Sequence, residues 1–450
     1  MRQNRLEYKK FLVKEGGNKQ NSLSKVKRFS DDAVVGGDWS YYHEGDAEMN
    51  VSLEAIKKAR ETLAGVVCRT ELAYTNTLSD MTGNRIYLKL ENQQRTGSFK
   101  LRGAYNKIAN LSEAERKMGI IASSAGNHAQ GTALGGTLFG IPTTIVMPKN
   151  APLSKVKATR AYGAQVVLHG SVYDEAYAEA CRLQAEKQLT FIHPFNDPMV
   201  IAGQGTIALE ILEDLPDVEA VVVPIGGGGL IAGIAVAIKN LKPGIKVIGV
   251  QTKNMPSMAE AIANKRITTC NGCPTIADGI AVKTPGELTF DLVQRYVDDI
   301  VTVDEEEIAS TILLMMERIK TISEGAGAAA VAAVLNRLEV FENRRIAAIV
   351  SGGNIDVNMM SRIINKGLAK SGRKAVFHIV IPDKPGSLWQ LLKLTADTGA
   401  NVLTVTHDRE TGGVALGNAA VQLELETADQ DHMHAIKEIM EQHQYCVKIV

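Results

Sequence analysis

Eight short apolar runs rich in β-branched residues recur along residues 66–365, and helix-length segments rich in Ala, Leu, Glu and Lys separate them. The runs lack the polar alternation of a half-exposed strand, which indicates strands that are covered on both faces. Strands that each lead into a helix predict a parallel sheet and therefore an α/β architecture. The runs are 86–90, 119–123, 143–148, 164–170, 220–225, 246–251, 299–303 and 344–351.

The ends of the chain follow other patterns. Residues 375–450 read as β-α-β-β-α-β, which predicts a ferredoxin-like unit, and the hydrophilic segment 366–374 predicts a linker before it. An amphipathic helix is predicted from Leu53 to Gly65 with Ser52 as its N-cap, so we place the main domain at 49–365. Residues 1–48 are basic at first and then acidic without an apolar core, and we interpret them as a disordered or misassigned extension.

Composition narrows the class of protein. The chain has 450 residues, 45% hydrophobic and 22% charged, as expected for a globular protein of two or three domains. Fifty basic side chains balance fifty acidic ones, so no net field favours nucleic acid or an anionic membrane as a partner. Five irregularly spaced cysteines indicate a reducing compartment, and we expect the cytoplasm. Pro224 and four glycines divide the uncharged stretch 220–238, so we expect a strand, a loop and a helix there, with no membrane span.

Four loops that join strands to helices carry residues suited to chemistry. Lys100 follows the small polar turn 96–98 at a helix start, where an isolated lysine is most often a surface residue. Small residues at 123–126 leave backbone N–H groups uncovered before Asn127, which favours a bound carboxylate or phosphate. Four glycines at 226–229 let the backbone curl around a phosphate, and Ser351 places a hydroxyl at a strand end before two glycines.

These four loops together suit pyridoxal phosphate, which needs an amine, a phosphate cradle, an amide donor and a partner for its ring nitrogen. The motifs that carry them are SFKLRGA, SAGNHAQG, GGGGLIAG, TIADGIAV, SEGAGA and SGGN, in that order. On these motifs, residues 50–365 resemble the fold-type II pyridoxal-phosphate lyases, specifically threonine dehydratases (threonine ammonia-lyases). The resemblance implies a tryptophan synthase β-like core of two subdomains with parallel sheets.

The resemblance also implies roles for individual residues. Lys100 is expected to hold the cofactor aldehyde and, once freed, to remove the Cα proton, with Phe99 beside the cofactor ring. Asn127 is expected to face the ring oxygen and Ser351 the ring nitrogen, while Glu324 lines the site. The phosphate is expected on Gly226, Gly227, Gly228, Gly229 and Leu230, and the substrate carboxylate on the backbone of Ser124, Ala125, Gly126, Asn127 and His128.

The expected reaction is dehydration and deamination of L-threonine to 2-oxobutanoate and ammonia, and of L-serine to pyruvate. A neutral hydroxyl at Ser351 makes the cofactor ring a weaker electron sink than a carboxylate would, which favours rapid loss of the β-hydroxyl over transamination. The cofactor phosphate is the expected proton donor to the leaving hydroxide.

Serine racemase, or another fold-type II enzyme, is the alternative within the family. Racemases carry a serine just before the Gly-Asn of the asparagine loop, where this chain has Ala125. They also bind a divalent metal through an acid after the strand that here ends at Gln251, so we expect no metal. The glycines fit a dinucleotide pattern through Gly227, Gly229 and Ala232, but Gln251 stands where a nicotinamide site needs an acid. A non-catalytic amino-acid sensor is the third hypothesis, and the presence of Lys100 argues against it.

Residues 375–450 resemble an ACT regulatory domain, with DKPGSL as the first turn. The resemblance implies an amino-acid effector, such as isoleucine or valine, bound between two copies of the domain by Asp383, Gly386 and Asn401. A purely structural dimerisation module is the alternative. A homo-oligomer, either dimer or tetramer, is expected in both cases.

Overall fold

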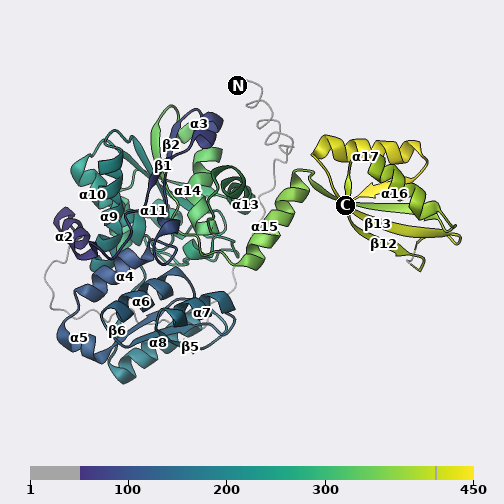
Figure 1. Ribbon diagram of the computed structural model, residues 1–450. Helices are drawn as coiled ribbons and strands as arrows, with labels where there is room; N and C mark the ends of the chain where they lie inside the picture. The colour runs from purple at the N-terminus through teal and green to yellow at the C-terminus, as the bar shows by residue number, and fades with distance from the viewer. Residues whose placement is uncertain (1–50, 411–412) are drawn as a thin grey trace, which may run out of the picture.

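The computed structural model describes residues 51–410 and 413–450 (Figure 1). A large α/β core is followed by a separate antiparallel domain, and helix α15 (Val357–Lys370) joins the two. The extension expected at 1–48 lies outside the described residues. Among the described helices, none is long and apolar enough to cross a membrane.

The larger sheet of the core has six strands in the order β1-β2-β10-β7-β8-β9. All neighbours from β2 to β9 pair in parallel, and β1 pairs antiparallel at one edge. The α/β prediction is therefore confirmed, although the short edge strand β1 was not predicted. The strands are β1 (Leu72–Tyr74), β2 (Arg85–Lys89), β7 (Ala220–Pro224), β8 (Lys246–Thr252), β9 (Asp299–Val303) and β10 (Arg345–Ile349).

Both faces of this sheet are covered by helices, as the apolar runs predict. Val221 and Val223 point into a core shared with α2, α9 and α10. Their neighbours Ala220 and Val222 point into a second core shared with α13 and α14. Buried side chains on both faces explain why the strand runs carry no polar alternation. The helices are α2 (Leu53–Leu63), α9 (Pro198–Asp214), α10 (Gly229–Leu241), α13 (Glu305–Leu314) and α14 (Gly325–Asn336).

The smaller sheet forms a second subdomain, with parallel strands in the order β5-β4-β3-β6. Its strands are β3 (Ile120–Ser123), β4 (Thr143–Met147), β5 (Gln165–Leu168) and β6 (Thr190–Phe191), of which β6 was not predicted. Helix α4 packs against α6 of this subdomain and against α9 of the other, so it lies between the two sheets (Figure 1). The other core helices are α3 (Asn76–Thr82), α4 (Lys100–Ala109), α5 (Glu113–Met118), α6 (Asn127–Leu138), α7 (Leu153–Ala161), α8 (Tyr173–Lys187), α11 (Ser257–Asn264) and α12 (Glu287–Tyr296).

Two local predictions in the core are confirmed. The Ser52 hydroxyl accepts a hydrogen bond from the Ala55 N–H at 3.1 Å and caps α2, which ends at Leu63. The uncharged stretch 220–238 is divided by its glycines into strand β7 and helix α10. Every residue of α10 from Gly229 to Ile238 is buried, so its apolar character reflects a position inside the core.

The C-terminal domain has the predicted β-α-β-β-α-β order and a ferredoxin-like sheet, β12-β13-β11-β14, antiparallel throughout. Helix α15 continues to Lys370, so the first five positions of the predicted linker 366–374 are helical. Asp356 caps α15 at its start, and Leu368, Ala369 and Lys370 favour the helix until Gly372, whose φ is +69°. The elements are β11 (Lys374–Pro382), α16 (Ser387–Asp397), β12 (Asn401–Asp408), β13 (Asn418–Glu426), α17 (Gln430–Gln442) and β14 (Cys446–Ile449).

Candidate active site

Three of the four loops singled out in the sequence follow adjacent parallel strands. The Lys100 loop follows β2, the Ser351 loop follows β10 and the glycine loop follows β7, so all three lie at the carboxyl edge of one sheet. The first two loops also pair with each other. The Phe99 N–H donates to the Ser351 carbonyl at 3.2 Å, and the Gly353 N–H donates to the Gly97 carbonyl at 2.9 Å. The structure therefore brings Lys100 and Ser351 together.

Lys100 is the first residue of α4, and its side chain is half-buried. Its Nζ donates a hydrogen bond to the Pro194 carbonyl at 2.7 Å and lies 5.3 Å from the centre of the Phe99 ring. Burial lowers the pKa of this amine to about 8, against the opposing charge of Glu324. An amine with that pKa is partly neutral near pH 7, so it can act as a nucleophile and as a base.

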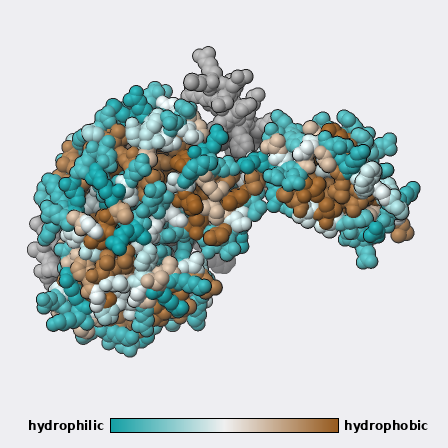
Figure 2. All heavy atoms as spheres, in the orientation of Figure 1, coloured by the Kyte–Doolittle hydropathy of each residue, from teal (hydrophilic) through white to brown (hydrophobic). Residues whose placement is uncertain are grey.

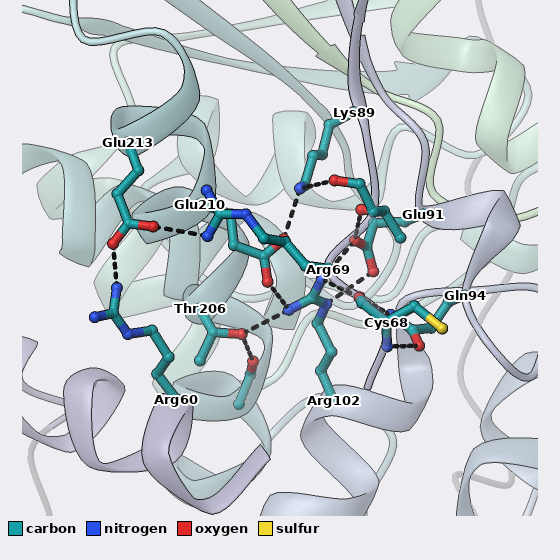
Figure 3. Close-up of polar contacts among 12 residues, drawn as sticks. Arg60, Cys68, Arg69, Lys89, Glu91, Gln94, Arg102, Thr206, Glu210 and Glu213 are labelled. Atoms are coloured by element: carbon teal, nitrogen blue, oxygen red, sulfur yellow. Dashed lines mark hydrogen bonds and ion pairs between the residues drawn. The ribbon is translucent and has the colours of Figure 1, made fainter. Parts of the chain in front are cut away.

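A buried ionic network holds the helix that carries Lys100 (Figure 3). Arg102 is 1% exposed, and its guanidinium donates to Glu91 at 2.8 and 2.9 Å and to Glu210 of α9 at 2.6 Å. Lys89, at the end of β2, donates to the other oxygen of Glu210 at 2.6 Å. Two cations and two anions thus neutralise one another, and they tie β2 and α9 to the first turn of α4.

The helix start predicted to bind a carboxylate is α6. Its N-cap is Gly126, and no side chain caps it, so N–H groups of its first turn are left for an anion. Ser124 instead accepts a hydrogen bond from the Gly126 N–H at 3.2 Å, which shapes the turn. Ala125 is half-buried beside them. The arrangement suits the carboxylate of an amino acid.

The side chain of His128 does not titrate near pH 7. Its ring is buried, and its Nε2 lies 2.7 Å from the Ile192 carbonyl, so the ring faces the end of β6. Burial and the charge of Lys100 lower the pKa of His128 to about 3, and the bond to Ile192 only partly offsets this. The ring is therefore neutral near pH 7, and His128 can contribute to substrate binding through its backbone N–H.

The glycine loop forms a concave backbone turn at the start of α10. Gly228 has a φ of +95°, a conformation that residues with a Cβ rarely adopt, and no side chain caps the helix. Thr289 of α12 holds the loop by donating to the Gly227 carbonyl at 2.6 Å. The ring of Phe195 packs so closely that a Cβ on Gly227 would lie 2.4 Å from it. Uncapped N–H groups at this turn suit a phosphate.

Glu324 is buried at the start of α14 and contacts the side chain of Asn127. Its Oε1 accepts a hydrogen bond from the Asn127 side chain at 2.5 Å, and a Cβ on Gly352 would reach this oxygen at 2.4 Å. Burial raises the pKa of Glu324 to about 7, and Asp278 adds to the increase, while Lys155, Asn127 and Lys100 oppose it. Lys155 of α7 and Asp278, which form an ion pair of 2.8 Å between the two subdomains, were not predicted.

The residues present fit pyridoxal phosphate on the geometry of this chain. A buried amine lies at one end of the site, an uncapped glycine turn offers N–H groups for a phosphate, and the side chain of Asn127 is half-buried at the start of α6. Ser351 is 3% exposed at the end of β10, next to the Lys100 loop. In residues 51–410 and 413–450, no group of three His, Cys, Asp or Glu side chains could hold a metal ion. Gln251 instead uses its amide within the fold, because its Oε1 accepts from the Ala259 N–H at 2.9 Å.

This fold and this site define an enzyme class, and the family comparison gives the same class. Residues 63–352 match the family model described as pyridoxal-phosphate dependent enzyme, so the chain belongs to this family and uses pyridoxal phosphate.

Three individual proteins of known name or structure are similar to this chain. The chain is 59% identical over 400 residues to a protein of Thermotoga maritima named L-threonine ammonia-lyase, covering 89% of this chain and 100% of that one. The solved threonine deaminase isoform 2 of Solanum lycopersicum, in its processed form, matches with a TM-score of 0.66 and 39% identity, over 69% of this chain and 93% of that one. Maize serine racemase also matches, with a TM-score of 0.66 and 35% identity, over 71% of this chain and 98% of that one.

The three residues expected to bind an effector do not meet within one chain. Asp383 and Gly386 follow β11 near Pro382, which pairs with Asn418 of β13. Asn401 begins β12 and pairs with Glu426 at the other end of β13. The two ends of this nine-residue strand are about 26 Å apart. A site that contains all three residues therefore needs a second copy of the domain.

Proposed function

We propose that this chain converts L-threonine to 2-oxobutanoate and ammonia, and L-serine to pyruvate and ammonia. The observation that carries the proposal is the buried Lys100 amine, whose pKa of about 8 makes it a usable base beside the uncapped start of α6. The name L-threonine ammonia-lyase of the Thermotoga maritima relative supports the choice of reaction. The test is to supply threonine and serine separately to the purified holoenzyme and to measure oxo acid, ammonia and D-serine.

Each part of the site has a role in this reaction. When bound, pyridoxal phosphate draws electrons from the α-carbon of the amino acid and weakens its Cα–H bond. Lys100 removes that proton with its neutral amine, and the backbone of residues 124–128 orients the substrate carboxylate. Residues 226–230 are proposed to hold the phosphate, and Asn127 and Ser351 to contact the ring. Phe99 lies beside the amine and contributes to the core on one face of the larger sheet.

Ala125 favours elimination over racemisation. Inversion of the α-carbon needs a second proton donor opposite Lys100, and a methyl group has no proton to give. We expect Ala125→Ser to produce measurable D-serine from L-serine and to lower oxo-acid formation several-fold. Chiral chromatography of the product measures both. Ala151→Ser, a methyl-to-hydroxymethyl change in the loop before α7, is the control, and D-serine formation by the unchanged enzyme would contradict this account.

The C-terminal domain is proposed to regulate the enzyme as an ACT domain. Its sheet has the ferredoxin-like order, and Figure 2 shows hydrophobic residues exposed on its surface. Large apolar side chains exposed on this domain include Trp389, Leu403 and Val405. Such side chains suit contact with another copy of the chain, which supports a homo-oligomer, either dimer or tetramer. The cytoplasm is the proposed location.

Isoleucine or valine is the proposed effector. We expect either amino acid to change the KM for threonine or the sedimentation coefficient of the wild-type protein, and Asn401→Ala to abolish that response. Asn365→Ala, which changes an exposed asparagine of α15, is the control. The absence of any change in activity, assembly or melting temperature with both amino acids would overturn the regulatory proposal.

A further inference from the structure

Asn127 can serve as a donor to the cofactor ring only if its side-chain amide is oriented with the nitrogen toward the ring. An amide has two orientations that differ in the positions of oxygen and nitrogen, and the hydrogen-bond partners decide between them. Asn127 has two such partners. Its Nδ2 donates to Glu324, and its Oδ1 accepts from the Asn354 Nδ2 at 2.7 Å.

The orientation of the Asn354 amide is determined by a group that can only accept a hydrogen bond. Its Nδ2 donates to the backbone carbonyl of Thr96 at 2.8 Å, and a carbonyl can only accept. The Thr96 carbonyl therefore fixes the nitrogen of Asn354, and that nitrogen in turn fixes the oxygen of Asn127. Glu324 alone could not do this, because a protonated carboxyl group can also donate a hydrogen bond.

The Asn354 side chain also packs closely against the loop that carries Lys100. A Cβ on Gly97 would lie 2.4 Å from the Asn354 Oδ1, so this side chain lies directly against the Lys100 loop. Gly97 also has a φ of +73°, which favours glycine. Asn354 thus connects three of the site loops: its own loop after β10, the Lys100 loop through Thr96, and the start of α6 through Asn127.

From this geometry we propose that Asn354 is a positioning residue, which holds the Asn127 amide with its second N–H free to face the oxygen of the cofactor ring. This inference rests on the proposed role of Asn127. Asn354 is the last residue of the SGGN motif. The sequence does not show its partners, because Thr96 and Asn127 lie more than 220 residues away along the chain.

The test replaces the donor with an acceptor of the same shape. In Asn354→Asp, the carboxylate oxygens face the Thr96 carbonyl and the Asn127 Oδ1 and repel both. The Asn127 amide is therefore expected to flip by 180°, so that its Nδ2 faces the new carboxylate. We expect the dissociation constant of pyridoxal phosphate to rise about tenfold. We also expect the visible absorbance of the bound cofactor to lose intensity to its near-ultraviolet band, because the ring oxygen then keeps its own proton. The kcat for threonine should fall more than its KM rises.

Two controls make the outcome specific. Asn358→Asp makes the same chemical change on the exposed first turn of α15, and we expect wild-type affinity and spectrum. In an Asn127→Ala background, Asn354→Asp should have no further effect, because the two residues act as one unit. If Asn354→Asp does not fold, Asn354→Ala removes the donor without adding a charge, and the same affinity and spectrum are compared.

An unchanged spectrum and affinity in Asn354→Asp, or an effect that persists in full without the Asn127 side chain, would overturn the inference. A wild-type protein that binds the cofactor but makes no oxo acid from threonine would instead contradict the proposed function, and it would leave the spectral comparison intact.

Discussion

Replacing Lys100 with alanine is expected to reduce 2-oxobutanoate formation from threonine by about a thousandfold. One amine performs two tasks in this site, attachment of the cofactor and removal of the Cα proton, and alanine can do neither. The visible absorbance of the lysine-bound cofactor should disappear with the activity, whereas far-UV circular dichroism should not change. Lys117→Ala, on the exposed side of α5, should keep both signals.

The lowered pKa of Lys100 gives this prediction a second measurement. Only the neutral amine attacks an aldehyde, and its fraction rises about tenfold for each unit of pH below the pKa. Because burial lowers that pKa to about 8, recombination of the apoprotein with pyridoxal phosphate should accelerate with pH and level off above about 8. A rate that continues to rise toward the ordinary lysine value of 10.5 would show that the amine is not buried as described. Retained absorbance in Lys100→Ala would refute its role as the attachment point.

Arg102→Met should be the most destabilising single change near the site. It leaves the buried carboxylates of Glu91 and Glu210 with one fewer cation, and breaking a buried ion network of this kind costs about 3–5 kcal/mol. Urea unfolding followed by circular dichroism measures this loss. The double variant Arg102→Met/Glu91→Gln should be less destabilised than the sum of the two single changes, because it removes an opposite pair together.

The pH dependence of the same network has a defined sign. Burial alone raises the pKa of Glu91, but attraction and hydrogen bonds from Arg102, helped by Thr70 and Lys89, outweigh burial and leave the pKa below its ordinary value of 4.5. The stabilisation by Glu91 is therefore present above about pH 4.5 and is lost as the pH falls toward the lowered value. The wild type should lose more stability on acidification over this range than Glu91→Gln does. Arg182→Met, which breaks only exposed pairs on α8, should cost less than about 1 kcal/mol.

The parts of the site that could be predicted are those that a short stretch of neighbouring residues defines. Each of the four loops combines a strand end, small residues and a helix start within about ten positions, so the sequence alone is enough to propose Lys100, Ser351 and the glycine turn as site residues. The parallel sheet then brings three of the loops to one edge. The sequence did not reveal residues whose role depends on contacts with residues far away along the chain. Glu210 and Arg102 are 108 positions apart, and nothing local marks either of them as part of a buried network.

Two short strands, and the helical form of residues 366–370, were missed for a different physical reason. Strands β1 and β6 have three and two residues, too few to show a pattern before their neighbours in the sheet are known. The hydrophilic segment after residue 365 was interpreted as a linker because it lacks apolar residues, yet α15 continues through its first five positions. A helix that joins two domains needs only a narrow apolar stripe, so polar composition alone does not distinguish it from a loop.

Helix α15 also has a mechanical consequence. It begins three residues after Asn354 and ends four residues before β11, so it connects the loop after β10 to the first strand of the C-terminal domain through one short turn at residues 371–373. Its 14 residues span about 21 Å. A helix carries a change of angle along its whole length, so a tilt of α15 would move the segment that holds Asn354 and Ser351. Under the proposed regulation, helix α15 is the covalent path along which an effector bound to the C-terminal domain would act on the cofactor site.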